Sequence, residues 1–267
     1  MVLTAQKAKR RLAAVTRSGL ALFCATVLLS TQASAFDIDV CEQEELHFHI
    51  AELCSKAISN QAAAQVEPSR IFTLRGYAWL REDEPIGAVA DFSLAIKMDG
   101  RNISALKGRA RAYSALKRYD EAVRDWTLVV SMQPEGEDHY RARALAYLEL
   151  GKTKEAFADY DKAIEIKANN PDSYIGRARI YQRMAMRDAA LREFDRAAAA
   201  DPEYPETYFA KAQAAESWGD ADMAIQNYAL VLRYNGDVWY AQRAMKRLGA
   251  KFSDFEARDA AQPKDEP

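Results

Sequence analysis

The sequence predicts an all-α protein, a solenoid of five helical hairpins in tandem, and two periodic features carry this prediction. A small residue recurs every 34 residues, at Ala88, Ala122, Ala156, Ala190 and Ala224. An aromatic residue stands four positions after each of them, at Phe92, Trp126, Tyr160, Phe194 and Tyr228. A period of this length is typical of stacked repeats, because one hairpin alone cannot bury its apolar face.

Each repeat also carries markers for its first helix and for its end. The first helix contains a second column of small residues, at Gly76, Ala110, Ala144, Ala178 and Ala212. Three residues later comes a column of Trp79, Tyr113, Tyr147, Tyr181 and Ala215. The period closes at Gly100, Pro134, Ala168, Pro202 and Gly236, where Pro and Gly end the second helix. Small residues let two helix backbones approach, so each period is expected to fold as a helical hairpin.

These columns resemble the tetratricopeptide repeat family over residues 69–236, without an insertion. The resemblance implies a right-handed α-α superhelix that binds other proteins, with no catalytic activity, cofactor or metal. The chain departs from the family pattern where Gly100, Ala168 and Gly236 replace Pro and where Ala215 stands in the aromatic column. These changes are expected to soften single turns and to leave the fold intact.

The first 35 residues have the order of an export signal. Five basic residues, the last of them Arg17, precede a short apolar run from Gly19 to Leu29, which is followed by the triplet Ala33, Ser34 and Ala35. This order predicts a signal peptide over 1–35 that is cleaved after Ala35 and delivers the chain to the periplasm. The apolar run is short for a membrane span, and an uncleaved anchor is the alternative.

Export changes the interpretation of the cysteines. Cys41 and Cys54 are the two that follow the signal, and in an oxidising compartment such a pair is expected to form a disulfide. His47 and His49 between them suggest a metal site as the alternative. Their spacing of two residues on a helix points them to different faces, which disfavours that alternative.

The flanks of the repeats are expected to cap the solenoid. Residues 36–68 form an N-terminal cap segment in which Leu46, Ile50 and Leu53 share a helical face. Residues 237–249 are predicted to form a C-terminal capping helix, because a solenoid otherwise ends on an apolar surface. Residues 250–267 are too polar to order themselves and are predicted to be a flexible tail.

The charge of the exported chain excludes one class of partner. The chain has 37 Lys and Arg against 39 Asp and Glu, and the signal removes five basic residues and no acidic ones, which leaves a formal charge of −7. Nucleic-acid binding is disfavoured, since it rests on a basic surface. No membrane span is expected after cleavage of the signal.

Two charged columns run through the repeats. Arg75, Arg109, Arg143, Arg177 and Lys211 occupy one position of the first helix. Asp91, Asp125, Asp159, Glu193 and Asn227 occupy one position of the second. The two positions lie at about the same height in a hairpin, so we expect a ladder of ion pairs that fixes the stacking; a charged recognition stripe is the alternative.

The family resemblance places protein binding on the concave face formed by the first helices. Transferred to this chain, that groove comprises Tyr77, Leu80, Lys107, Arg111, Arg141, Leu145, Leu148, Ile175, Arg179 and Phe209, with Arg183 beside it. Arginine next to exposed apolar side chains suits an extended segment that carries carboxylates. The alternative is a solvated helix face that only keeps the protein soluble.

Function is therefore predicted to be that of a scaffold and not of an enzyme. The sequence contains no H-E-x-x-H, no G-x-S-x-G and no glycine-rich phosphate loop. We expect an adaptor that holds an unidentified periplasmic or envelope protein. The alternative is a structural component of the envelope that assembles with copies of itself, as a homo-oligomer, and takes no peptide ligand.

Overall fold

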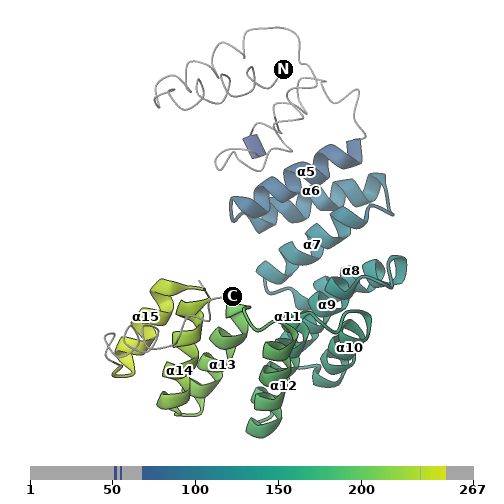
Figure 1. Cartoon of the computed structure of the whole chain (residues 1–267). Coiled ribbons are helices and arrows are strands. Elements are labelled where there is room, and N and C mark those ends of the chain that lie inside the picture. Colours follow the sequence, from purple (N-terminus) through teal and green to yellow (C-terminus); the bar gives the residue numbers. More distant parts are fainter. Residues whose placement is uncertain (1–50, 53–54, 56–67, 235, 251–267) are drawn as a thin grey trace, which may run out of the picture. The chain divides into compact units, whose positions relative to one another are not determined.

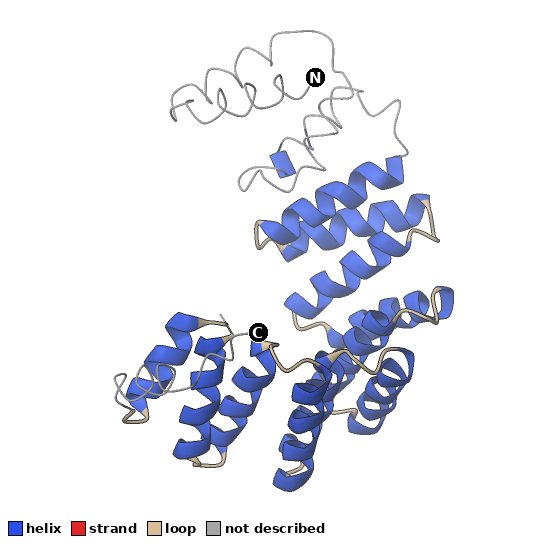
Figure 2. Ribbon diagram, viewed as in Figure 1, coloured by secondary structure: helices blue, strands red, loops and turns tan. Residues whose placement is uncertain are grey.

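The computed structural model describes residues 51–52, 55, 68–234 and 236–250, and every regular element in these ranges is a helix (Figures 1 and 2). The chain divides into two compact units, residues 1–105 and 106–267, with the boundary inside α7 (Ile103–Ala115). The first unit contains α5 (Pro68–Arg81) and α6 (Pro85–Met98). The second contains α8 (Tyr119–Met132), α9 (Glu137–Glu149), α10 (Thr153–Ile166), α11 (Pro171–Arg183), α12 (Arg187–Ala200), α13 (Pro205–Ser217), α14 (Ala221–Arg233) and α15 (Val238–Arg247).

The first unit is one helical hairpin with a short helical piece against it. Gly76 on α5 faces the ring of Phe92 on α6, and a Cβ at this position would lie 2.7 Å from that ring. Ala51 is buried against Ala78, and its N–H donates to the carboxylate of Glu82 over 3.1 Å. Glycine thus allows the close approach of the two helices that the small column predicts.

Consecutive helices pack against one another throughout the second unit. The hairpins α9/α10, α11/α12 and α13/α14 stack through the contacts of α10 with α11 and of α12 with α13. The small column of the second helices is completely buried, from Ala88 in the first unit to Ala224 in the second. The aromatic column beside it is at most 4% exposed. Both columns are therefore core, which confirms the all-α solenoid that the period predicts.

The last helix covers the end of the stack. α15 lies where the sequence predicts a capping helix. Its N-cap residue is Asp237, whose side chain accepts a hydrogen bond from the N–H of Tyr240. Such a cap satisfies one of the free amides of the first turn. Ala241, Ala244 and Met245 are buried against α13 and α14 residues that include Ala212 and Tyr228.

The ladder of ion pairs is present in four repeats and ends before the fifth. Arg75, Arg109 and Arg143 each bind an aspartate of the second helix with two hydrogen bonds, and Arg177 binds Glu193. Lys211 instead binds Asp195 of the preceding hairpin, because Asn227 is not acidic and its amide donates to the carbonyl of Met223. The predicted ladder is confirmed for these four repeats and is wrong for the fifth.

The turn inside each hairpin repeats one backbone conformation. Positive φ angles recur every 34 residues, at Asp83, Lys117, Gly151, Ala185 and Gly219. This left-handed conformation ends a helix and normally takes glycine, because a Cβ is crowded there. Asp83, Lys117 and Ala185 adopt it with side chains, at φ between 57° and 58°.

Several predicted features fall outside the described residues. These are the signal peptide, the cysteine pair, His47, His49 and most of the N-terminal cap segment 36–68 and of the tail 250–267. Among the described helices, none is long and apolar enough to cross a membrane.

Candidate functional site

Two adjoining cavities open on the second unit between α7 and α13. They share Leu145 of α9 and Arg179 of α11, so together they form one elongated depression, which we call the groove. Six of the predicted binding residues line the first cavity: Arg111, Arg141, Leu145, Ile175, Arg179 and Phe209. Leu148 and Arg183 line the second.

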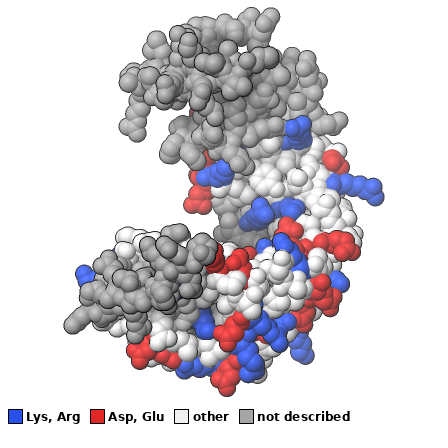
Figure 3. Space-filling model, in the orientation of Figure 1, with Lys and Arg blue, Asp and Glu red and all other residues white. Residues whose placement is uncertain are grey.

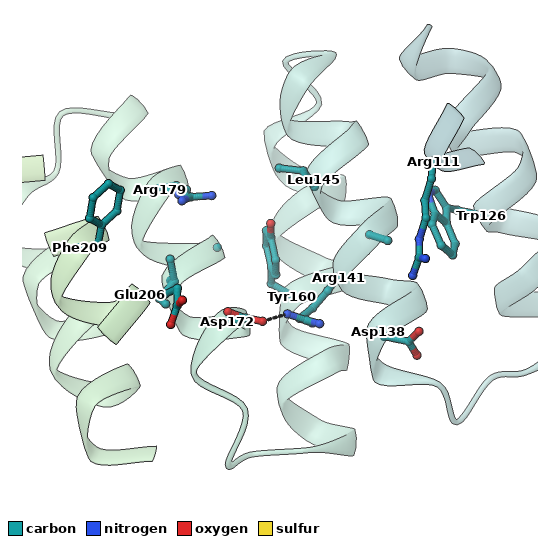
Figure 4. A pocket seen from close by; sticks show the side chains of 13 residues that line it. Arg111, Trp126, Asp138, Arg141, Leu145, Tyr160, Asp172, Arg179, Glu206 and Phe209 are labelled. Carbon is teal, nitrogen blue, oxygen red and sulfur yellow. Dashed lines mark hydrogen bonds and ion pairs between the residues drawn. The ribbon is translucent and has the colours of Figure 1, made fainter. Parts of the chain in front are cut away.

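The first cavity has a volume of about 370 Å³ and an aromatic floor (Figure 4). Tyr160 of α10 reaches it between α9 and α11 and is only 4% exposed. Gly176 of α11 makes this possible, since a Cβ there would overlap the Tyr160 ring. Burial raises the pKa of Tyr160 to about 12, against the opposing pull of Arg179 and Arg141. The floor is therefore a neutral phenol at physiological pH.

Two of the predicted cations are already neutralised within the protein. Arg141 forms ion pairs with Glu137 on its own helix and with Asp172 on α11, and the latter is drawn in Figure 4. Lys107 binds Asp138 over 3.0 Å and lies equally close to Nε2 of the buried His139. Asp172 also accepts a hydrogen bond from the hydroxyl of Tyr204. These contacts join successive repeats, so both cations help to hold the walls of the groove in place.

Arg111 and Arg179 are different. Both are exposed, they come from α7 and α11, and they line the same cavity. Among the residues that the structure describes, neither has a hydrogen-bond or ion-pair partner, whereas Glu206 is an unpaired carboxylate beside Phe209. The groove thus offers two uncompensated guanidinium groups and one carboxylate at its α13 side.

The second cavity is larger, about 720 Å³, and its two cations other than Arg179 are already bound to groups of the protein. Arg183 donates to Glu149 and to the backbone carbonyl of Leu148. Arg187 pairs with Asp220 and stacks on Trp218, with its guanidinium 5.1 Å from the ring centroid. Leu145, which is 46% exposed, links this cavity to the first. The open surface of the second cavity therefore consists mostly of apolar side chains and of groups that can form hydrogen bonds.

The remaining predicted residues lie elsewhere. Tyr77 and Leu80 are on α5 in the first unit, where the Tyr77 hydroxyl donates to the carbonyl of Ser104.

Sequence reasoning missed Tyr160 and Trp126, because the aromatic column was interpreted only as core. It also missed Trp218 and Glu206, which stand outside the columns that were transferred. Figure 3 shows Lys and Arg interspersed with Asp and Glu on the visible face of the second unit.

Comparisons with known proteins agree with this architecture. Residues 144–184 match a family model described as TPR repeat, and residues 205–237 match one described as tetratricopeptide repeat. No curated protein sequence matches the chain.

Solved structures resemble the chain over most of its length. A tetratricopeptide repeat protein from Parabacteroides merdae is 20% identical, covers 80% of this chain and 87% of its own, and has a TM-score of 0.60. A thermophilic TPR protein of Thermus thermophilus is 20% identical, with 72% and 97% covered and a TM-score of 0.54. MamA is 18% identical, with 60% and 94% covered and a TM-score of 0.50. These likenesses show a tetratricopeptide-type solenoid and, with the two model matches, support the assignment to that repeat family.

Proposed function

We propose that this protein is a periplasmic scaffold without catalytic activity, which holds an extended, carboxylate-bearing segment of an envelope protein in the groove. The observation that carries the proposal is the pair Arg111 and Arg179, two exposed guanidinium groups on one cavity without partners among the described residues. The tetratricopeptide fold itself suggests a protein-protein interaction scaffold.

The chemistry of the cavity favours carboxylates over other anions of similar charge. A guanidinium binds a carboxylate through two parallel hydrogen bonds, and this geometry adds specificity to the attraction. Leu145 and Phe209 offer apolar contact between and beside the arginines. A peptide whose acidic and apolar side chains alternate at every second residue fits this arrangement, because side chains two residues apart in an extended peptide face the same side.

Glu206 gives the ligand a direction. It lies on α13 beside Phe209, so a carboxylate of the ligand is repelled at that end and attracted between α7 and α11. We therefore expect the acidic part of the ligand to lie near Arg111 and Arg179 and a neutral or basic part near Glu206. Three predicted cations hold the shape of the groove and do not bind the ligand, because each already forms an ion pair with a carboxylate of the protein: Arg141, Lys107 and Arg183.

The periplasmic location rests on the N-terminal residues alone. Basic residues, a short apolar run and the Ala33, Ser34, Ala35 triplet stand in the order of a cleaved signal. Edman sequencing of the protein released by osmotic shock should begin at Phe36. Recovery of the chain with residues 1–35 in the membrane fraction would replace secretion with anchoring.

The groove is tested by reversing its two unpaired charges. The variant Arg111→Glu with Arg179→Glu should lose capture of its envelope partners, measured by crosslinking in cells and quantitative mass spectrometry. The matched control is Arg124→Glu with Arg192→Glu, which makes the same charge change at exposed positions of the second helices α8 and α12. Circular dichroism should show the same helicity in both variants, because all four side chains are exposed.

The comparison separates site-specific binding from net charge. Proteins captured by the parent and by the control, and lost from the groove variant, are the expected ligands. If both variants lose the same proteins, or neither loses any, the groove is not the binding site.

A further inference from the structure

A row of exposed apolar side chains runs along α6 in the first unit. Ile86 is 71% exposed, Leu94 40% and Met98 54%, and the exposed Ala90 stands between them. The four residues are spaced by four and form one ridge on the face opposite Ala88, Phe92 and Ala95, which pack on α5. We call this ridge the α6 stripe.

The solenoid itself does not need apolar residues at these positions. The residues equivalent to Ile86, Ala90 and Leu94 in α8, α10 and α12 are mainly charged: Asp120, Arg124, Lys154, Lys162, Asp188, Arg192 and Arg196. The position of Met98 is apolar in these helices too. In α6 all four positions are apolar, and the repeat pattern does not account for Ile86, Ala90 and Leu94. A contiguous apolar patch on a soluble protein commonly marks an interaction site.

We propose that the α6 stripe is a homodimer interface, in which α6 packs antiparallel against α6 of a second copy of the chain. The charges at the two ends of the helix favour a second copy as the occupant. Asp83 and Glu84 are exposed before its first turn and Lys97 is exposed in its last turn. Within the described residues, none of these three side chains has an ion-pair partner.

Antiparallel pairing places opposite charges side by side at both ends of the two helices. Lys97 of one copy comes beside Asp83 and Glu84 of the other, and the symmetric contact repeats at the opposite end. A parallel pair would place carboxylates beside carboxylates and Lys97 beside Lys97. The helix dipoles add to the preference, because the negative end of each helix meets the positive end of the other. A two-fold interface of this kind uses the same surface on both copies.

The shape of the stripe also suits helix packing. Rows of side chains spaced by four residues interlock between two helices that cross at about 50°, the commonest arrangement in globular proteins. Ala90, in the middle of the row, lets the two backbones approach. A helix of 14 residues is about 21 Å long, so the contact is smaller than the roughly 800 Å² per copy of a stable interface. The dimer is therefore expected to be weak and to depend on protein concentration.

The substitution Leu94→Lys tests the interface. The protein is purified from its native cells and studied by sedimentation equilibrium. It should show a monomer-dimer equilibrium with a dissociation constant on the order of micromolar, typical of small interfaces. Leu94→Lys should weaken it at least tenfold, because both copies then bring a cation into the apolar contact. Leu128→Lys is the matched control: Leu128 is 47% exposed at the equivalent position of α8, and its change should leave the equilibrium as it is.

A charge exchange tests the antiparallel register. Lys97→Glu alone should weaken the dimer, since it faces Asp83 and Glu84 of the second copy. Lys97→Glu combined with Glu84→Lys should restore most of the association.

A chain that is monomeric at every concentration overturns the proposal, as does equal weakening by Leu94→Lys and Leu128→Lys. Failure of the exchange to restore the dimer rejects the antiparallel pairing. Because the groove lies in the second unit, these outcomes are independent of the peptide-binding test.

Discussion

Arg143 of α9 and Asp159 of α10 join through two parallel hydrogen bonds, Nε to Oδ2 at 2.7 Å and Nη2 to Oδ1 at 2.8 Å. Asp159 is only 6% exposed, and its hydrogen bonds raise the pKa of Arg143 above the ordinary value of an arginine. Two more aspartates in the ladder are bound in the same bidentate way. The pair therefore fixes the two helices of a hairpin at one height.

Arg143→Ala should destabilise the solenoid by on the order of 3 kcal/mol, because it leaves the buried carboxylate of Asp159 without its cation. Urea unfolding followed by circular dichroism measures this change. Arg111→Ala is the control, and it should change the free energy of unfolding by less than about 0.5 kcal/mol, as exposed substitutions usually do. Arg141 is not a suitable control, since it pairs with Asp172. Equal unfolding midpoints for Arg143→Ala and Arg111→Ala would contradict a structural role for the ladder.

The turn conformation leads to a stabilising substitution. Lys117 has φ of 58°, which costs an L-residue on the order of 1 kcal/mol relative to glycine. Lys117→Gly should raise stability by up to that amount, less the greater entropy of glycine in the unfolded chain. Arg192→Gly, at an exposed position inside α12, is the contrasting change and should lower stability by about 1 kcal/mol. If thermal unfolding shows the same loss for both variants, the strain at Lys117 is absent in solution.

The sequence allowed the core and the ladder to be predicted because both repeat with the period of 34. It did not reveal the contacts between repeats. Arg141 meets Asp172 from 31 positions away, and this pairing depends on how α9 stacks on α11, which the columns do not encode. The fifth ladder pair failed because Asn227 has no charge, so Lys211 takes Asp195 of the preceding hairpin. Tyr160 belongs to the core column and also forms the cavity floor, a double role that depends on the missing side chain of Gly176.

Gly176→Ala should displace the aromatic floor of the groove and lower the stability of the protein. The added methyl overlaps the ring of Tyr160, which must move out of its place in the floor. Overpacking of this kind costs about 1 to 3 kcal/mol, against a gain of about 1 kcal/mol from the better helix propensity of alanine. Thermal unfolding of Gly176→Ala in the parent and in a Tyr160→Leu background separates the two effects. The substitution should be less harmful, or beneficial, in the second background; an equal loss in both would exclude the steric clash.

Cys41 and Cys54 lie outside the described residues, and their pairing stays a prediction from the exported state. A disulfide that closes a loop of this length is expected to stabilise the chain by about 3 kcal/mol, mainly by restricting the unfolded state. Peptide mapping of unreduced protein from the periplasm should find the two cysteines in one linked pair of peptides. Two free thiols in that material would disprove the bridge.

Glu206 tests the direction of the ligand in the groove. If the carboxylates of the ligand lie near Arg111 and Arg179, Glu206→Gln should strengthen capture of the same partners, because it removes the unpaired negative charge from the cavity. The gain should be modest, about twofold to fivefold, since an exposed charge is worth less than about 1 kcal/mol. Asp222→Gln, an exposed acidic position on α14, controls for net charge.

The effect of Glu206→Gln should shrink as salt is raised, because exposed charges are screened over about 8 Å at physiological ionic strength. Binding curves of one captured partner at low and physiological salt measure this dependence. A larger gain for Glu206→Gln than for Asp222→Gln at low salt, with convergence at high salt, is the expected pattern. If Glu206→Gln weakens the partner instead, the basic part of the ligand contacts Glu206 directly and the carboxylate contribution of Arg111 and Arg179 must be measured one residue at a time. If neither substitution alters binding at any salt, the ligand does not approach the α13 side of the groove and the proposed direction is wrong.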